Sequence, residues 1–173
     1  GQRSLAVSGN SANRVFYFNS GNNTMSRLTI RDGNATAPGG TGAGTAGGGI
    51  FNALGSTLAL SDCTLSNNHA QGANNTTASG AGGFGDGGAI SNSGNLTVSR
   101  CTLAGNSAVG GSGADASGMM GANLHGGDGG PALGAAIFND SSATLTMSDS
   151  TVGTNIATGG AAGKGQFGGN GGA

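Results

Sequence analysis

Apolar residues alternate with small polar ones at three places along the chain. The stretches read Leu58-Ala-Leu60-Ser-Asp-Cys63, Leu96-Thr-Val98-Ser-Arg-Cys101 and Leu145-Thr-Met147-Ser-Asp-Ser150. A period of two places every second side chain on the same face, which is typical of a β-strand with one buried face. Each stretch is therefore predicted to be a strand that turns its apolar side chains inward.

Two further patterns flank these strands. Before them stand Gly49-Ile50-Phe51-Asn52, Ala89-Ile90-Ser91-Asn92 and Ala136-Ile137-Phe138-Asn139. After them comes a six-residue pattern: an apolar residue, two variable positions, a fourth position that is usually Asn, one more variable position, and Ala. That pattern occurs at 7–12, 30–35, 65–70, 103–108 and 152–157. Each repeat unit is predicted to hold three short strands separated by Gly, Asn or Ser-Asp turns.

No single unit has enough apolar side chains for a core, so the units are expected to stack on one another. Stacking at about 4.8 Å would bury equivalent residues as ladders. An asparagine ladder is expected at a turn, because asparagine tolerates left-handed backbone and bonds locally. The predicted ladders are Leu58, Leu96 and Leu145; Leu65, Leu103 and Val152; and Asn68, Asn106 and Asn155.

The stacking predicts one all-β domain over residues 1–173, a right-handed parallel β-helix of about four coils. Glycine-rich inserts at approximately 36–48, 71–87, 109–134 and 158–173 fall at the same place in each unit. They are expected to project as long loops from one edge of the β-helix. Some glycines lie on one three-residue frame, such as Gly160, Gly163, Gly169 and Gly172. This spacing fits polyglycine-II-like extended helices or flexible loops, and both alternatives stay open. The segment 15–21 aligns less cleanly, so its inward-facing aromatic residues stay open as well.

Composition narrows the classes of function. Glycine makes up 40 of 173 residues, charged residues 8%, and the net charge is −1. Glycine-rich sequence is often disordered, but the apolar pattern favours a solenoid. The six Lys and Arg residues are scattered, so nucleic acid is not an expected partner. No apolar run is long enough to span a membrane. We interpret the chain, which starts inside a repeat, as a mature or processed piece.

The carboxylates suggest one candidate for catalysis. Asp62 and Asp149 occupy equivalent strand ends with Arg100 between them, and Arg27 extends the column. Such a column is either an acid–base pair with a cation or an exposed charge ladder. We interpret it as a charge ladder and assign no catalytic residue.

Metal and thiol chemistry are also open to prediction. His69 and His125 lack partners at ligand spacing, so no metal ligand is assigned and no cofactor is expected. Calcium is an alternative at Asp86 and Asp128, whose glycine-rich loops offer carboxylate and carbonyl oxygens.

Cys63 and Cys101 align in adjacent units. At about 4.8 Å they lie within disulfide range, so a disulfide and two buried free thiols both stay open.

The repeats resemble a known group of proteins. Leu5-Ala-Val-Ser-Gly-Asn-Ser-Ala-Asn-Arg-Val-Phe16, Leu28-Thr-Ile-Arg-Asp-Gly-Asn34 and the Gly-x-Ile-Phe-Asn and Cys-Thr-Leu-x-x-Asn units are similar to repeats of bacterial surface and secreted β-helix proteins. That group has a pectin-lyase-like fold and includes polymorphic outer-membrane-type repeats and autotransporter-like adhesins. The resemblance implies an extracellular or cell-surface location. It does not decide the function, because the same scaffold carries adhesins, passengers and polysaccharide-cleaving enzymes.

The function that we expect is a non-enzymatic filament, sheath or matrix subunit whose partner is itself. Neither end of the repeat array shows a polar cap, and open ends present unpaired strand edges for end-to-end stacking. The first alternative is an adhesin or passenger-domain fragment that binds a surface or glycan. The second is an enzyme similar to polysaccharide lyases or hydrolases. Concentration-dependent polymerisation of this segment would separate the filament subunit from the adhesin fragment.

Overall fold

The fold is built from strands. The computed structural model describes residues 5–116, 125–165, 169 and 171–173, and in these it has 20 strands and no helix. The strands form five sheets in which every strand pair is parallel. The predicted all-β fold is confirmed, and the parallel sheets are compatible with a β-helix. The parts of the predicted domain and inserts at 1–4, 117–124, 166–168 and 170 lie outside the described residues.

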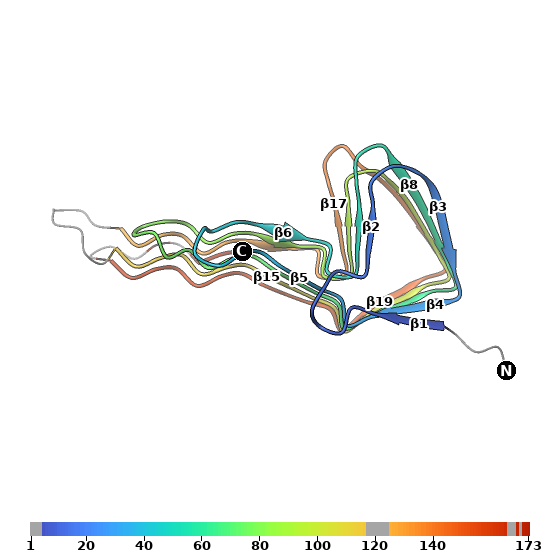
Figure 1. Cartoon of the computed structure of the whole chain (residues 1–173), viewed down its shortest axis with the longest axis horizontal. Helices are drawn as coiled ribbons and strands as arrows, with labels where there is room; N and C mark the ends of the chain where they lie inside the picture. The colour runs from blue at the N-terminus through green and yellow to red at the C-terminus, as the bar shows by residue number, and fades with distance from the viewer. Residues whose placement is uncertain (1–4, 117–124, 166–168, 170) are drawn as a thin grey trace.

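Three sheets surround a triangular interior (Figure 1). The base sheet has the order β1-β4-β9-β14-β19, with β1 (Leu5–Ser8), β4 (Leu28–Arg31), β9 (Thr64–Ser66), β14 (Thr102–Ala104) and β19 (Thr151–Gly153). The near wall has the order β17-β12-β7-β2, with β2 (Phe16–Phe18), β7 (Ile50–Asn52), β12 (Ile90–Asn92) and β17 (Ile137–Asn139). The far wall has the order β18-β13-β8-β3, with β3 (Gly21–Ser26), β8 (Ser56–Ser61), β13 (Asn95–Ser99) and β18 (Thr144–Ser148).

Two more sheets form a long arm beside the near wall (Figure 1). The outgoing arm sheet has the order β20-β15-β10-β5, with β5 (Asn34–Thr36), β10 (His69–Gln71), β15 (Ser107–Val109) and β20 (Ile156–Thr158). The returning arm sheet has the order β16-β11-β6, with β6 (Thr45–Ala46), β11 (Gly85–Asp86) and β16 (Ala132–Leu133). Each predicted insert starts at the last residue of an outgoing strand, and the first three contain a returning strand.

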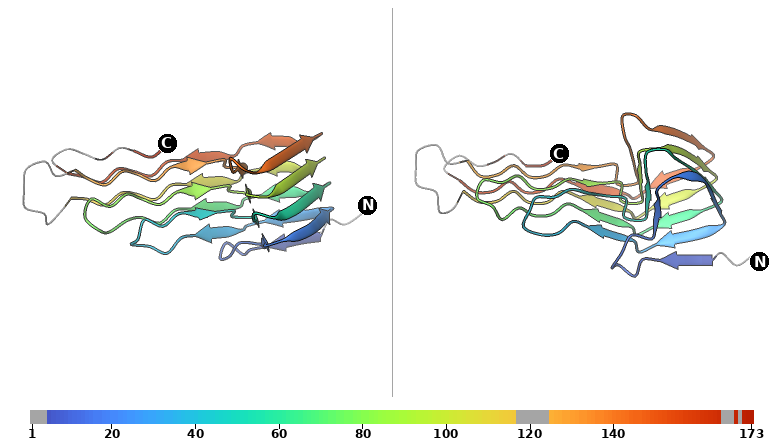
Figure 2. Two further views of the ribbon diagram at one scale, coloured as in Figure 1. Left: turned by 90° about the horizontal axis from the view of Figure 1, so that it is seen from above. Right: turned by 45° about the horizontal axis from the view of Figure 1, so that its top comes forward.

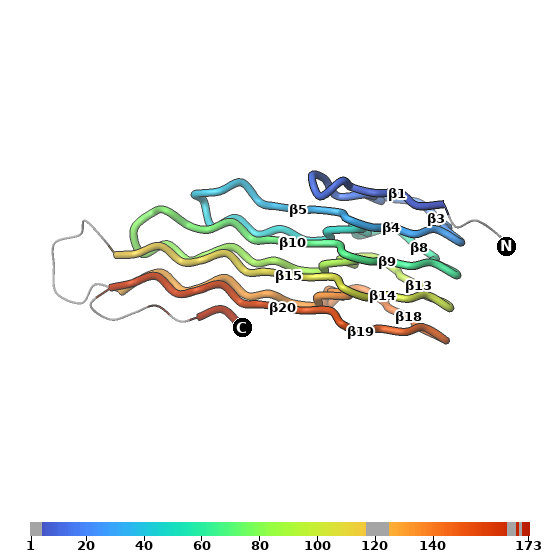
Figure 3. Tube along the Cα trace, turned by 90° about the horizontal axis from the view of Figure 1, so that it is seen from below, coloured from blue at the N-terminus to red at the C-terminus, as the bar shows by residue number. Residues whose placement is uncertain are grey.

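The chain visits the sheets in a fixed order. From β2 it passes through the near wall, the far wall, the base sheet, the outgoing arm and the returning arm, and β7 starts the same order again. Equivalent strands from successive rounds lie side by side (Figure 2, Figure 3). The repeat in the sequence is therefore a repeat in space, with equivalent residues one strand spacing apart.

Inward side chains of the walls and the base sheet fill the interior. In β8, buried and half-buried residues alternate without exception, as a period of two requires. Each fully buried Leu or Ile contributes about 1.5–3 kcal/mol relative to exposure. The most fully buried apolar side chains are Ile30, Ile50, Leu58, Leu60, Leu65, Ile90, Leu96, Val98 and Leu103.

Strand β2 turns two of its three aromatic side chains inward. Phe16 pairs with Ile50 in register, and both Phe16 and Phe18 pack against the core. Tyr17 is exposed and stacks on Phe51, with ring centroids 5.1 Å apart. The register of β2 on β7 thus resolves which aromatic residues face inward, the point that the sequence leaves open.

The arm packs backbone against backbone. Hydrogen bonds cross back and forth between its outgoing and returning segments. The donors and acceptors are Ala73 N to Ala43 O, Gly83 N to Ala73 O, Gly111 N to Gly83 O, Gly130 N to Gly111 O, Gly160 N to Gly130 O and Gly172 N to Gly160 O, all at 2.8–2.9 Å. Two neighbouring outgoing segments are joined by a bond at every third residue. The backbone N–H groups of Gly110, Gly113 and Ala116 donate to the carbonyl oxygens of Thr158, Ala161 and Lys164. The period of three seen in the sequence is thus a period of hydrogen bonding.

This packing leaves no room for side chains at most arm glycines. A Cβ on Gly111 would lie 1.9 Å from the carbonyl oxygen of Ala73, and one on Gly130 would lie 1.9 Å from that of Gly83. Gly39, also in the arm, has no described atom within 4 Å of the place of its Cβ. Glycine is therefore required at the arm positions where two backbones approach closely. It is not required at every position of the arm.

Candidate functional site

The predicted charge column lies at the corner between the far wall and the base sheet. Arg27, Asp62, Arg100 and Asp149 each follow the last residue of a far-wall strand. All four have left-handed backbone, with φ of 56°, 54°, 50° and 50°. A single left-handed residue turns the chain sharply between two strands, and non-glycine residues adopt it rarely. Equivalent corners stack, so the column alternates in charge along the molecule.

Arg100 forms a bidentate ion pair with Asp62 in this column. Its Nε and Nη2 donate to the two carboxylate oxygens at 2.8 and 2.9 Å. The hydrogen bond from Arg100 lowers the pKa of Asp62, and the same bond raises the pKa of Arg100. Both side chains are exposed to solvent, so the pair adds little to stability. An ionised, guanidinium-bound carboxylate fits a charge ladder better than a general acid.

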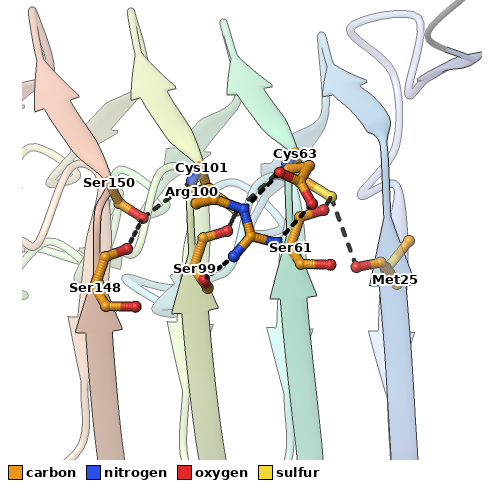
Figure 4. Close-up of polar contacts among 9 residues, drawn as sticks. Met25, Ser61, Cys63, Ser99, Arg100, Cys101, Ser148 and Ser150 are labelled. Carbon is orange, nitrogen blue, oxygen red and sulfur yellow. Dashed lines mark hydrogen bonds and ion pairs between the residues drawn. The ribbon is translucent and has the colours of Figure 1, made fainter. Parts of the chain in front are cut away.

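Cys63 and Cys101 follow this corner and point into the interior. Both are free thiols, and each is 2% exposed. The backbone N–H of Cys63 donates to Sγ of Cys101 at 3.4 Å, and that of Cys101 donates to Oγ of Ser150 at 3.0 Å. Figure 4 shows these three residues at equivalent positions of successive corners, each directly before a base-sheet strand. The structure thus has two buried thiols at these positions, and the disulfide stays a prediction.

Each cysteine thiol also donates back to its own strand. Sγ of Cys63 bonds the carbonyl oxygen of Ser61, and Sγ of Cys101 bonds that of Ser99, both at 3.2 Å (Figure 4). The neighbouring Cys101 side chain lowers the pKa of Cys63, and the neighbouring Cys63 side chain together with burial raises the pKa of Cys101. The pair is enclosed, so its thiols act mainly as small packing groups.

The predicted asparagine ladder runs along the corner between the base sheet and the arm. Oδ1 of Asn106 accepts from the backbone N–H and the Nδ2 of Asn68, at 3.0 and 2.9 Å. Nδ2 of Asn106 donates to Leu65 O at 3.0 Å and to Oδ1 of Asn155 at 2.9 Å. Asn68 and Asn106 are buried. Each amide therefore satisfies buried backbone groups and the next amide at once.

One of the two expected reasons for asparagine at these positions, its tolerance of left-handed backbone, was wrong. Left-handed backbone belongs to the residue before each of them, namely Asn67, Gly105 and Thr154, with φ of 55°, 68° and 54°. The ladder asparagines themselves point inward and serve as hydrogen-bonding groups.

A second asparagine ladder lies at the end of the near wall, and the sequence analysis did not assign it. Nδ2 of Asn52 donates to Oδ1 of Asn92, and Nδ2 of Asn92 donates to Oδ1 of Asn139, both at 2.7 Å. Oδ1 of Asn52 is buried and has no partner among the described residues. Its neighbour there is Phe18, which offers no side-chain donor. The signal was the asparagine that closes each Ile-Phe-Asn or Ile-Ser-Asn unit.

The two predicted apolar ladders lie in register. Leu58, Leu96 and Leu145 are consecutive in the far wall. Leu65, Leu103 and Val152 are consecutive in the base sheet, whose next strand adds Ile30. Both ladders end at exposed positions, Leu145 and Val152.

The remaining candidate ligands lie apart. Asp86 in β11 is 6% exposed, burial raises its pKa to about 6, and its Oδ1 has no partner in the described structure. Asp128 is exposed. Ring nitrogens of His69 contact Ser107 and Gln71. Within the described ranges, no three His, Cys, Asp or Glu side chains gather as a metal site would require.

The chain has no match in any of three comparisons, with protein-family models, with curated proteins and with solved structures. The described part of the chain also contains no helix long and apolar enough to cross a membrane. The features that the structure brings together are ladders of identical or complementary side chains, which run along most of the stack and reach its last strands.

Proposed function

We propose that the chain is a non-enzymatic, extracellular structural subunit that assembles end to end through β-helix stacking. The observation that carries the proposal is the tail surface, which we define as the outer edges of β17, β18, β19 and β20. These strands are last in their sheets and have no further partner strand among the described residues. A row of unpaired N–H and C=O groups is a template for another strand.

Apolar side chains at the tail surface are exposed although their equivalents are buried. Leu145 and Met147 are each 37% exposed, whereas Leu96 and Val98 one strand earlier are 2% and 0% exposed. Val152 is 50% exposed and its neighbour Leu103 is 0% exposed. One more set of strands would bury the tail residues in the same way. The hydrophobic effect therefore favours a strand-bearing partner at this surface.

The fold proposed here is a single right-handed parallel β-helix of the pectin-lyase-like type. The fixed order of sheet visits supports a continuous coil. The zigzag of backbone hydrogen bonds and its period of three support a polyglycine-II-like arm. A neutral, charge-poor surface and an arm of close-packed backbone suit a matrix or filament, because little charge repulsion opposes close contact.

The absence of catalysis is part of the proposal and rests on the aspartates. Asp62 is held by Arg100 at an exposed corner, and Asp86 lies in the arm. Clustered carboxylates, which polysaccharide cleavage needs, would have to converge on one cleft. An extracellular location is supported by the resemblance of the repeats to surface proteins and stays within the proposal.

A single substitution at the tail surface tests the assembly. Val152→Asp places a charge on the inward face of β19, where a stacked copy would bury it, so it should abolish concentration-dependent growth in sedimentation velocity. Thr151→Asp is the matched control, because its exposed side chain points outward from the same strand. It should assemble like the parent chain. Equal growth of the two variants would contradict the assignment of the tail surface.

A further inference from the structure

The sheets hold unequal numbers of strands. The near wall, the far wall and the outgoing arm sheet have four strands each, whereas the base sheet has five. The additional strand is β1, which lies on β4 at the end opposite the tail surface (Figure 3). We define the head surface as the outer edges of β2, β3, β4 and β5.

Residues 5–13, which we call the strap, cover part of the head surface. Strand β1 pairs with β4 from Leu5 opposite Leu28 to Ser8 opposite Arg31. The loop after it bonds the next corner and β5, with Ser11 N on Asp32 O at 2.7 Å and Asn34 N on Asn13 O at 2.9 Å. The strap thus occupies the edges of β4 and β5 but leaves β2 and β3 uncovered.

Unequal strand numbers prevent seamless stacking. Each copy in a strand-on-strand stack must add the same number of strands to every sheet, or the sheets fall out of step by about 4.8 Å. With the strap in place, β17 and β18 of one copy would meet β2 and β3 of the next, but β19 would meet β1. Without the strap, the base sheet has four strands, as the two walls and the outgoing arm sheet do. The returning arm sheet has three strands, and the segment 171–173 lies on the last of them, because Ala132 N donates to Ala173 O at 2.8 Å.

We propose that the strap is a displaceable cover of the head surface, and that β19 of a second copy takes the place of β1 on β4. The inference rests on the proposed end-to-end assembly and names the contact through which assembly is controlled. The strap keeps a single copy closed at its head, and the tail of another copy removes it.

The register of the base sheet supports the exchange. Val7 lies opposite Ile30, and the same column continues through Leu65 and Leu103 to Val152. Val152 of a second copy would therefore lie opposite Ile30, where Val7 lies now. Both are valine, so the exchange conserves the shape at that position.

The charge column supports head-to-tail stacking of the copies. It runs Arg27, Asp62, Arg100, Asp149 from head to tail, with alternating sign. Head-to-tail stacking brings Asp149 of one copy next to Arg27 of the following copy, which continues the alternation. The opposite polarity would bring like charges together at both junctions.

The strap is held less firmly than the strands that would replace it. Leu5 is 65% exposed, and β1 is paired on one side only. Asn10 and Ser11 both have left-handed backbone, with φ of 53° each, a conformation that costs energy for non-glycine residues. A docked tail would instead supply β17, β18, β19 and β20 together.

A reversible lock tests the strap in the 173-residue chain. Ala6 lies opposite Thr29, and paired strands bring Cα atoms to about 4.8 Å, within the range of a disulfide. The double variant Ala6→Cys with Thr29→Cys, oxidised with glutathione disulfide, should fix the strap and block assembly. Reduction with dithiothreitol should restore assembly. Each single cysteine variant, treated alike, is the control.

A second variant of the 173-residue chain weakens the strap. Val7→Asp places a charge on its inward face and should lower the critical concentration for assembly about tenfold, because apparent affinity scales with the fraction of open heads. Ala6→Asp, on the exposed outward face of β1, should leave it unchanged. Circular dichroism verifies that each variant is folded.

The outcomes separate the two proposals. Blocked assembly in the oxidised lock, with recovery on reduction and a lower critical concentration for Val7→Asp, supports the strap. An oxidised lock that assembles as well as the parent overturns the strap and leaves end-to-end assembly standing. If no variant assembles at any concentration, Val7→Asp included, the proposed function fails and the strap inference fails with it.

Discussion

The role of an individual residue in this chain depends mainly on the equivalent residues of the neighbouring repeat units, with which it forms a ladder. An asparagine at one position of the repeat is an exposed turn residue, as at Asn67, or a buried link, as at Asn68 one residue later. The alternating pattern predicted the apolar columns because burial follows strand period directly. It could not show the role of the asparagines, because that role depends on which carbonyl and amide groups the neighbouring strands leave unpaired.

Asp86 is a buried carboxyl group whose charge depends on pH. Burial raises its pKa from 3.8 to about 6, so the folded state binds this proton more tightly than the unfolded chain. The stability that the group contributes is present below about pH 4 and is lost as the pH rises through about 6. Nothing in the sequence around Asp86 marks it as buried, because the burial comes from arm segments far away along the chain.

Replacing this carboxylate tests that reasoning. Asp86→Asn cannot ionise, so the variant should be more stable than the parent by about 1–2 kcal/mol at pH 8 and close to it at pH 4. Chemical unfolding at both pH values measures the difference. Asp149→Asn, at an exposed corner, controls for the loss of one carboxylate elsewhere. An Asp86→Asn variant with the same relative stability at both pH values would show that Asp86 is not protonated more readily in the folded state.

At the scale of elements, the arm is the part that the sequence described least well. Glycine spacing was consistent with both order and flexibility, since a flexible loop and a packed polyglycine segment have the same composition. Residues such as Gly83 and Gly111 are far apart in sequence but bonded in the structure. The walls were easier to predict, because Leu58 and Leu96 mark the buried faces of their strands by alternation alone.

A single methyl group tests the packing of the arm. Gly111→Ala would bring Cβ to 1.9 Å from the Ala73 carbonyl oxygen, so the segments must separate, at a cost of about 1–3 kcal/mol. Amide hydrogen exchange in the arm should then accelerate while exchange in the walls stays slow. Gly39→Ala, in the same arm but with open space at Cβ, should leave exchange unchanged. Equal acceleration in both variants would point to lost backbone flexibility and not to close packing.

At the scale of the whole molecule, the account depends on the two ends of the stack. The repeats predicted that equivalent strands pair. The unequal strand numbers could not be read from the sequence, because they depend on which strands lack an equivalent in the other sheets. Strand β1 has no counterpart in the walls, and that is visible only once the pairing is known.

The most direct test of end-to-end assembly is cryo-electron microscopy of the parent chain and the Val7→Asp variant across a concentration series. Four strands per copy in the two walls and the outgoing arm sheet, at a spacing of about 4.8 Å, predict filaments with an axial rise of about 19 Å per subunit. That rise, with the arms stacked along one side, would establish seamless head-to-tail stacking with the strap displaced. Monomers at every concentration in both samples, or filaments whose rise does not match four strand spacings, would contradict the account.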